Sequence, residues 1–172
     1  GHFLNFQGAF ATSFLIMIQL GAIVAVVIFY RQKIWGALHH LGQGQWGRHL
    51  LIQVFVAVLP SFAVALVFKD LIKSLFGNIM VVAITLILGA LLLQGAEMIG
   101  NRRKKQNKTI KNQLEELTWK DSLMVGLFQC LALVPGMSRS GSTISGGLIK
   151  GLSPRLAAEL SFFMAIPVMA GA

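Results

Sequence analysis

The chain has 172 residues, of which 55% are hydrophobic and 12% are charged, and its formal net charge is +9. Soluble domains are about 45–50% apolar and about 25% charged, so this composition indicates an integral membrane protein and excludes an ordinary soluble domain. A basic balance can indicate nucleic-acid binding, but the basic residues here gather between apolar stretches, so a nucleic-acid partner is excluded.

Long apolar stretches predict the membrane spans. A spanning helix needs about 20 apolar residues, and the stretches 9–30, 50–68 and 79–99 meet this requirement. Pro60 predicts a kink in the second stretch, which membrane helices tolerate when neighbours satisfy the freed backbone groups. A last span is predicted over 155–172. Because the chain does not start with methionine and its end is apolar without a stop signal, we expect an internal fragment of a longer protein.

The segments between the spans carry the charge and predict the orientation. Segments 31–49 and 100–120 share one side and hold ten basic residues, against two in segment 69–78. By the positive-inside rule, the side with ten basic residues faces the cytoplasm. The run 102–105 also has the composition of an anionic-lipid site, but a determinant of topology is the favoured interpretation.

Two short apolar segments around a break predict a re-entrant or broken-helix pair over 118–152. Thr118 and Asp121 fit a capping box, which predicts a helix start. The apolar run that follows is too short to span the membrane and ends at Pro135. Ser153-Pro154 then combines a good N-cap with proline at the first helical position. The expected fold class is therefore an all-α polytopic membrane protein, single-domain over the whole chain.

The polar segment 135–143, Pro-Gly-Met-Ser-Arg-Ser-Gly-Ser-Thr, lies within this break. An arginine at the centre of a membrane helix costs about 2.5–3.5 kcal/mol on insertion scales. No carboxylate lies between Asp121 and Glu159, so the expected partner of Arg139 is an anion. The guanidinium fork matches phosphate oxygens, and a helix starting near Ser142 would direct free N–H groups into the same space.

The other residues of the polar segment fit the same chemistry. Gly136 and Gly141 let a ligand approach the backbone closely, and hydroxyl groups come from Ser138, Ser140, Ser142 and Thr143. Together with Arg139, these residues favour phosphate or diphosphate as the ligand. The glycine spacing resembles a P-loop, but Ser142 occupies the position of the required lysine, which excludes a nucleotide hydrolase. A break that only lets helices pack closely would explain the glycines and serines but not Arg139.

The polar segment also carries a resemblance. Residues 128–147, Phe-Gln-Cys-Leu-Ala-Leu-Val-Pro-Gly-Met-Ser-Arg-Ser-Gly-Ser-Thr-Ile-Ser-Gly-Gly, resemble the signature of the undecaprenyl-diphosphate phosphatases, also called bacitracin-resistance proteins. The match continues at 157–162 and 165–167, and near the start at 18–23 and 1–4. The resemblance covers essentially the whole chain.

The resemblance implies a function. The family removes the terminal phosphate of undecaprenyl diphosphate in the bacterial inner membrane, which recycles the lipid carrier for cell-wall synthesis and confers bacitracin resistance. Its site joins two re-entrant regions of an inverted repeat. This chain matches the second; the first, with paired glutamates and a Ser-Ser-Thr-Gly-His stretch, would lie upstream of Gly1. Family members often have Phe-Glu where this chain has Phe14-Leu15.

The resemblance and the chemistry together predict roles. Arg139 would clamp the diphosphate and stabilise the transition state, with Ser138 as nucleophile or phosphate ligand. Glu159 would hold the phosphate-binding residues in place without contacting the substrate itself. The expected substrate-binding residues are Gly136, Ser140, Gly141, Ser142 and Thr143.

The predicted cofactor and partners follow from the same substrate. A divalent cation, Mg²⁺ or Ca²⁺, is expected to neutralise phosphate oxygens, although the six acidic residues indicate no ligand set for it. The expected partners are the undecaprenyl diphosphate lipid, the bilayer and a second copy in a homo-oligomer. Two alternatives remain: a transporter or flippase for the same lipid, which would also use broken helices, and a structural membrane subunit.

Overall fold

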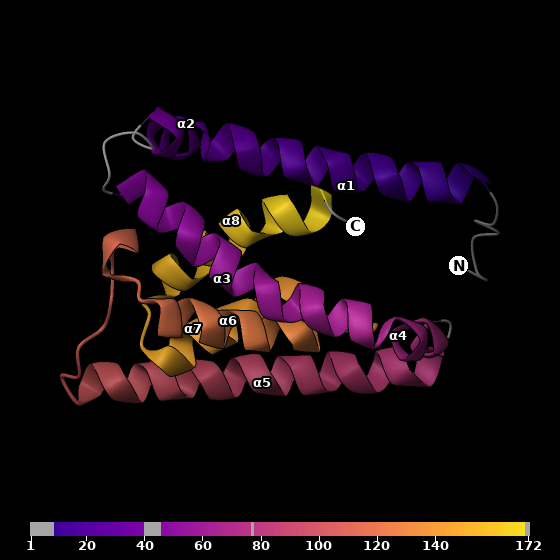
Figure 1. Cartoon of the computed structure of the whole chain (residues 1–172). Helices are drawn as coiled ribbons and strands as arrows, with labels where there is room; N and C mark the ends of the chain where they lie inside the picture. The colour runs from indigo at the N-terminus through magenta and orange to yellow at the C-terminus, as the bar shows by residue number, and fades with distance from the viewer. Residues whose placement is uncertain (1–8, 40–45, 77, 171–172) are drawn as a thin grey trace.

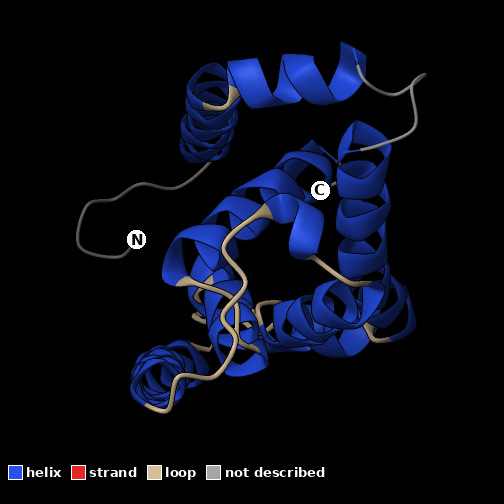
Figure 2. Ribbon diagram, turned by 90° about the vertical axis from the view of Figure 1, so that its left-hand side faces the viewer, coloured by secondary structure: helices blue, strands red, loops and turns tan. Residues whose placement is uncertain are grey.

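All regular elements in the computed structural model, which describes residues 9–39, 46–76 and 78–170, are helices (Figures 1 and 2). The all-α prediction is confirmed. The matched residues 1–4 and the end of the last predicted span, 171–172, lie outside the described residues. The elements are α1 (Ala9–Phe29), α2 (Arg31–His39), α3 (Trp46–Val67), α4 (Lys69–Leu75), α5 (Ile79–Lys105), the 3₁₀ helix η2 (Leu114–Glu116), α6 (Trp119–Leu131), α7 (Arg139–Lys150) and α8 (Pro154–Ala170).

Two helices of the described chain are long and apolar enough to cross a membrane, namely α3 with 22 residues and α5 with 27. A third candidate is the bent pair formed by Leu20–Phe29 and Arg31–Ala37, whose two parts meet at 73°. Figure 2 shows this bend as two helices lying across each other, and the pair contacts α3 and α8. The molecule is therefore a membrane protein with several candidate spans.

The segments predicted as loops contain more helix than expected. α5 continues through Lys105, so the basic loop predicted over 100–120 begins only at Gln106. Lysine and arginine are good helix formers, and positive side chains are favourable at a helix C-terminus, which explains the extension. The segments 31–49 and 69–78 likewise contain α2 and α4.

The loop that follows α5 is fixed to the turn between α7 and α8. The backbone N–H of Lys111 donates to the Gly151 carbonyl at 3.0 Å, and the Ser153 N–H donates to the Lys111 carbonyl at 2.8 Å. The Lys111 ammonium also forms an ion pair with Asp121. Asp121 in turn accepts the backbone N–H of Thr118 at 2.9 Å, as expected for the predicted helix start. These contacts keep the N-termini of α6 and α8 close to each other.

α6 packs against α3 through small and polar residues. A Cβ atom on Gly126 would lie 2.2 Å from the carbonyl oxygen of Ala57, so the two helices touch backbone to backbone. On the same side, the Ser122 hydroxyl donates to the Gln53 side chain at 2.7 Å, and the side-chain amide of Gln129 donates to Ser61 at 2.6 Å. Buried polar side chains in membrane proteins need such partners across helices.

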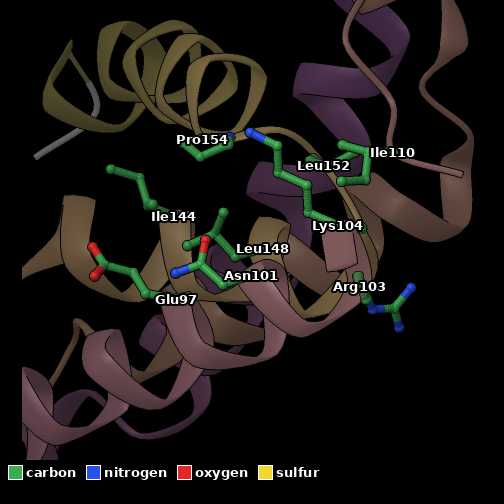
Figure 3. A pocket seen from close by; sticks show the side chains of 11 residues that line it. Glu97, Asn101, Arg103, Lys104, Ile110, Ile144, Leu148, Leu152 and Pro154 are labelled. Atoms are coloured by element: carbon green, nitrogen blue, oxygen red, sulfur yellow. The ribbon is translucent and has the colours of Figure 1, made fainter. Parts of the chain in front are cut away.

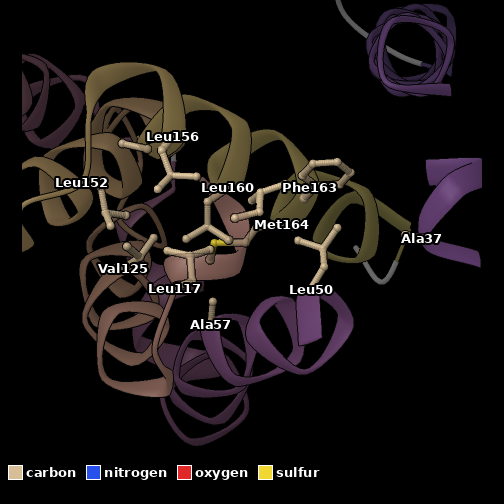
Figure 4. Packing of buried hydrophobic residues seen from close by; sticks show 12 residues of the cluster. Ala37, Leu50, Ala57, Leu117, Val125, Leu152, Leu156, Leu160, Phe163 and Met164 are labelled. Carbon is tan, nitrogen blue, oxygen red and sulfur yellow. The ribbon is translucent and has the colours of Figure 1, made fainter. Parts of the chain in front are cut away.

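The hydrophobic core lies between α3, α6 and α8 (Figure 4). Its fully enclosed members include Val125 from α6 and Leu156, Leu160 and Met164 from α8. Many large apolar side chains on α3 and α5 are exposed instead, as expected where lipid covers the helices. α7 packs against α5, α6 and α8. The core therefore fixes the position of α7, whose first turn carries the polar segment.

Replacing Gly126 with alanine is expected to lower the free energy of unfolding by about 1–3 kcal/mol, because overpacking forces the neighbouring backbone to move. Reversible unfolding of the full-length protein in mixed micelles measures this. The matched control is Gly95→Ala on α5, where an added Cβ has no neighbour within 4 Å. The close α3–α6 contact would be contradicted if both variants were as stable as the original protein.

Candidate functional site

The turn before α7 is held by α5. The Thr85 hydroxyl donates to the carbonyl of Pro135 at 2.6 Å. Gly136 has φ +92°, and a Cβ there would lie 2.3 Å from the Thr85 hydroxyl oxygen. One turn further along α5, a Cβ on Gly89 would lie 2.9 Å from the sulfur of Met137. Sequence reasoning missed Thr85; its only sequence signal is a hydroxyl residue within an apolar span.

α7 begins at Arg139, three residues before the expected start near Ser142, because Ser138 serves as its N-cap. The Ser138 side chain accepts the backbone N–H of Gly141 at 3.2 Å, and the first helical bond runs from the Ser142 N–H to the Ser138 carbonyl at 2.9 Å. The N–H groups of Arg139 and Ser140 precede this bond and have no acceptor within the helix. They can bind an anion at the positive end of the helix dipole.

A cavity of about 200 Å³ lies beside the start of α7. Arg139 and Ser140 of α7 and Ser161 of α8 supply its polar lining. Its apolar lining comes from α1 and α8, namely from Ala22, Val26, Phe162, Ala165, Ile166 and Met169. Arg139 is half-buried, and in the described chain it forms no ion pair with a carboxylate. The cavity thus combines an unneutralised cation with walls suited to a hydrocarbon chain.

The four hydroxyl residues of the segment fall into two pairs. Ser138 and Ser140 are exposed, with their hydroxyl oxygens 3.4 Å apart. Ser142 and Thr143 are buried, and their hydroxyls donate to the carbonyls of Ser138 and Arg139, each at 2.9 Å. The earlier helix start turns both hydroxyls into the protein, and their role in substrate binding stays a prediction.

Thr143 instead connects the polar segment to the last helix. Its hydroxyl lies 2.7 Å from that of Ser161, and both residues are buried. Ser161 also lines the cavity, so this contact fixes the first turn of α7 against the cavity wall. Sequence reasoning did not single out Ser161, which follows Glu159 by two residues in the matched segment 157–162.

Glu159, predicted to support the polar segment, forms its ion pair with α2. Its carboxylate pairs with the Lys33 ammonium at 2.6 Å and approaches the Arg155 guanidinium to 4.0 Å. The ion pair with Lys33 joins α8 to α2. At the corner between α1 and α2, Tyr30 packs against Phe163, with ring centroids 5.2 Å apart. Both contacts hold the α1–α2 pair beside α8. Because α1 and α8 form the apolar wall of the cavity, the ion pair of Glu159 helps to fix the position of that wall.

Side chains that could bind a metal ion do not cluster in the described part of the chain. Among the residues that the structure describes, no group of three or more His, Cys, Asp or Glu side chains could hold a metal ion. The acidic residue nearest in sequence to the polar segment on its C-terminal side, Glu159, is engaged with Lys33. The described residues alone therefore supply no complete ligand set for a divalent cation.

Comparisons with known proteins identify the family of the chain. A family model described as bacitracin resistance protein BacA matches residues 1–172. Two relatives named undecaprenyl-diphosphatase, from Thermoanaerobacter sp. (strain X514) and Thermoanaerobacter pseudethanolicus (strain ATCC 33223 / 39E), are each 44% identical over 170 residues. The alignments cover 98% of this chain and 61% of each relative, so the chain spans less than two thirds of their length. The chain belongs to the bacitracin resistance protein BacA family.

Proposed function

We propose that the protein containing this chain hydrolyses undecaprenyl diphosphate to undecaprenyl phosphate and inorganic phosphate. The observation that carries the proposal is the cavity at the start of α7, where Arg139, which pairs with no carboxylate among the described residues, meets apolar walls from α1 and α8. A polyprenyl diphosphate has the matching parts, a highly charged head and a hydrocarbon tail. The names of the two relatives support the same substrate. The activity would recycle the lipid carrier for cell-wall synthesis and confer bacitracin resistance.

The first turn of α7 binds the head of the substrate. Arg139 contacts phosphate oxygens through its planar fork, which favours bidentate hydrogen bonds. The free N–H groups of Arg139 and Ser140 contribute two more donors. The tail leaves along the apolar wall beside Val26, Phe162 and Ile166. Thr85 and Ser161 contact the polar segment from α5 and α8 and hold these donors in place.

Hydrolysis breaks the bond between the terminal phosphorus and the bridging oxygen, and the monophosphate lipid leaves with that oxygen. Charge develops on the transferring phosphoryl group, so positioned cations and N–H donors supply most of the catalysis. Arg139 is assigned this role. The nucleophile is either water or Ser138. A serine nucleophile needs a base, and the described partners of the Ser138 oxygen are Gly141 N–H and the Ser140 hydroxyl.

A divalent cation is also part of the proposal, although the described residues supply no ligand set for it. When bound, such an ion would neutralise phosphate oxygens. The roles given to Arg139, Ser138 and Ser140 do not depend on it. Family resemblance places glutamates and a histidine in the other re-entrant region, and these are the candidates for the ligands and the base.

The placement of the site along α5 supports an outward-facing cavity in the bacterial inner membrane. Thr85 lies six residues from the start of α5 at Ile79, which corresponds to about 9 Å, whereas the basic end at Lys105 is about 30 Å away. With the basic side in the cytoplasm, the polar segment lies in the outer half of the membrane. Substrate released outside the cell would reach it directly.

Phosphate release by the purified full-length protein tests the function. We expect one phosphate per molecule of undecaprenyl or farnesyl diphosphate, and a loss of release in EDTA that added Mg²⁺ or Ca²⁺ restores. Release that EDTA leaves unchanged would contradict the cation but not the phosphatase. If well-folded protein releases no phosphate with either cation present, the phosphatase proposal is wrong and transport of the same lipid becomes the better explanation.

A further inference from the structure

A second cavity, of about 320 Å³, lies at the opposite end of α7 from Arg139 (Figure 3). It is enclosed by the last turns of α5, the end of α7 and the start of α8. The residues that line it are Glu97, Gly100, Asn101, Arg103, Lys104, Ile110, Ile144, Leu148, Gly151, Leu152 and Pro154. α7 has 12 residues, so about 18 Å separates its two ends, and the second cavity is distinct from the candidate active site.

The second cavity has an apolar floor and a polar rim. Ile144 and Leu148 of α7 form the floor. Glu97, Asn101 and Lys104 follow each other at helical spacing on α5 and so share one face of that helix. In Figure 3, the Lys104 side chain extends across the cavity towards Pro154, and Asn101 lies over Leu148. A ligand here would meet charge at one side and hydrocarbon at the other.

The charges of the rim are available to a ligand. In the parts of the chain that the structure describes, Glu97, Asn101, Arg103 and Lys104 form no side-chain hydrogen bond or ion pair. Gly151 brings Arg103 close to the cavity, because a Cβ there would lie 3.1 Å from its guanidinium nitrogen. The rim thus carries two cations and one carboxylate without internal partners.

The depth of the second cavity matches the headgroup layer of a membrane. Its polar residues lie in the last third of α5, at and just beyond the end of the predicted span 79–99, and next to the loop that begins at Gln106. This is the basic end of the helix bundle. Basic pockets between helices at this level are typical binding sites for anionic lipid headgroups.

We propose that this cavity binds an anionic glycerophospholipid with hydroxyl groups in its head, of the phosphatidylglycerol class. Arg103 and Lys104 would contact the phosphate. The carboxylate of Glu97 would accept a hydrogen bond from a headgroup hydroxyl, which a choline headgroup cannot donate. An acyl chain would lie on Ile144 and Leu148. A soluble phosphate would leave this apolar floor uncovered, so we assign the site to a lipid.

Native mass spectrometry of the full-length protein in detergent, with dioleoyl phosphatidylglycerol or dioleoyl phosphatidylcholine added, tests the proposal. We expect phosphatidylglycerol to bind preferentially and the double variant Arg103→Gln/Lys104→Gln to weaken its binding about tenfold or more. The matched control Arg102→Gln/Lys105→Gln removes the same charge from the same helix end but from residues outside the lining, and should bind as the original protein does.

Two substitutions at Gly100 test whether the lipid needs the space of the second cavity, independently of its charge. A Cβ on Gly100 would lie 3.7 Å from a methyl carbon of Leu148, an ordinary contact distance. Gly100→Ala should therefore bind the lipid, whereas Gly100→Leu should fill the cavity and prevent binding while thermal unfolding stays unchanged. Glycerol 3-phosphate should not displace the lipid. Equal binding of both lipids, equal loss in both charge variants, or displacement by glycerol 3-phosphate would each overturn the proposal.

Discussion

Replacing Arg139 with alanine is expected to lower phosphate release by about 10²–10³-fold, the range found when one preorganised donor to transition-state charge is removed. The reason lies in its surroundings. Arg139 is the only basic residue that lines the cavity beside α7 in the described chain, and Ser140 and Ser161 are the other polar residues there. Neither serine carries charge to replace it. Phosphate release from farnesyl diphosphate by full-length protein measures the loss.

Arg139→Lys separates charge from geometry. Lysine keeps the positive charge but lacks the planar fork, so we expect only partial recovery of kcat relative to alanine. Arg48→Ala is the control, because Arg48 is exposed in the first turn of α3 and does not line the cavity. If Arg139→Ala and Arg48→Ala released phosphate equally well, Arg139 would have no catalytic role, even if the protein remained a phosphatase.

Local sequence patterns predicted the elements around the site. A capping box at Thr118 and the Ser153-Pro154 pair indicated the starts of α6 and α8, and the structure confirms both. These signals work because the N-cap side chain and the N–H groups it binds are only two or three residues apart. The start of α7 was placed too late, near Ser142, although Ser138 is an equally good N-cap four residues earlier. Several serines in one segment made the local signal ambiguous.

Contacts between distant segments could not be predicted from one sequence. Thr85 binds Pro135 across 50 residues, and Lys33 binds Glu159 across 126. Neither pair belongs to a periodic pattern, and both depend on how complete helices pack. For the same reason the sequence did not indicate that Glu159, predicted to support the polar segment, forms its ion pair with Lys33 of α2. The buried contact of Thr143 with another helix was missed in the same way.

A substitution at Gly136 tests the support from α5 directly. Gly136→Ala is expected to reduce phosphate release by about 10²-fold, since a displacement of about 1 Å in catalytic groups can have this effect. An alanine would have to adopt φ +92°, a backbone conformation that residues other than glycine rarely adopt. Its Cβ would also lie 2.3 Å from the Thr85 hydroxyl oxygen and 2.6 Å from the Val82 carbonyl oxygen. The turn must therefore move, and Arg139 moves with it.

Two companion variants show which constraint matters. Thr85→Ala removes the clash with the side chain, but the backbone oxygen of Val82 and the positive φ remain, so Gly136→Ala/Thr85→Ala should stay impaired. Gly141→Ala should have a smaller effect, because its Cβ would meet only the Ser138 side chain, at 3.2 Å. Activity and thermal unfolding of the full-length protein are measured together. Recovery in the double variant would show that the clash with the Thr85 side chain alone, rather than the positive φ of Gly136 or the Val82 carbonyl oxygen, impairs Gly136→Ala, and that the turn keeps its position without the Thr85 hydroxyl.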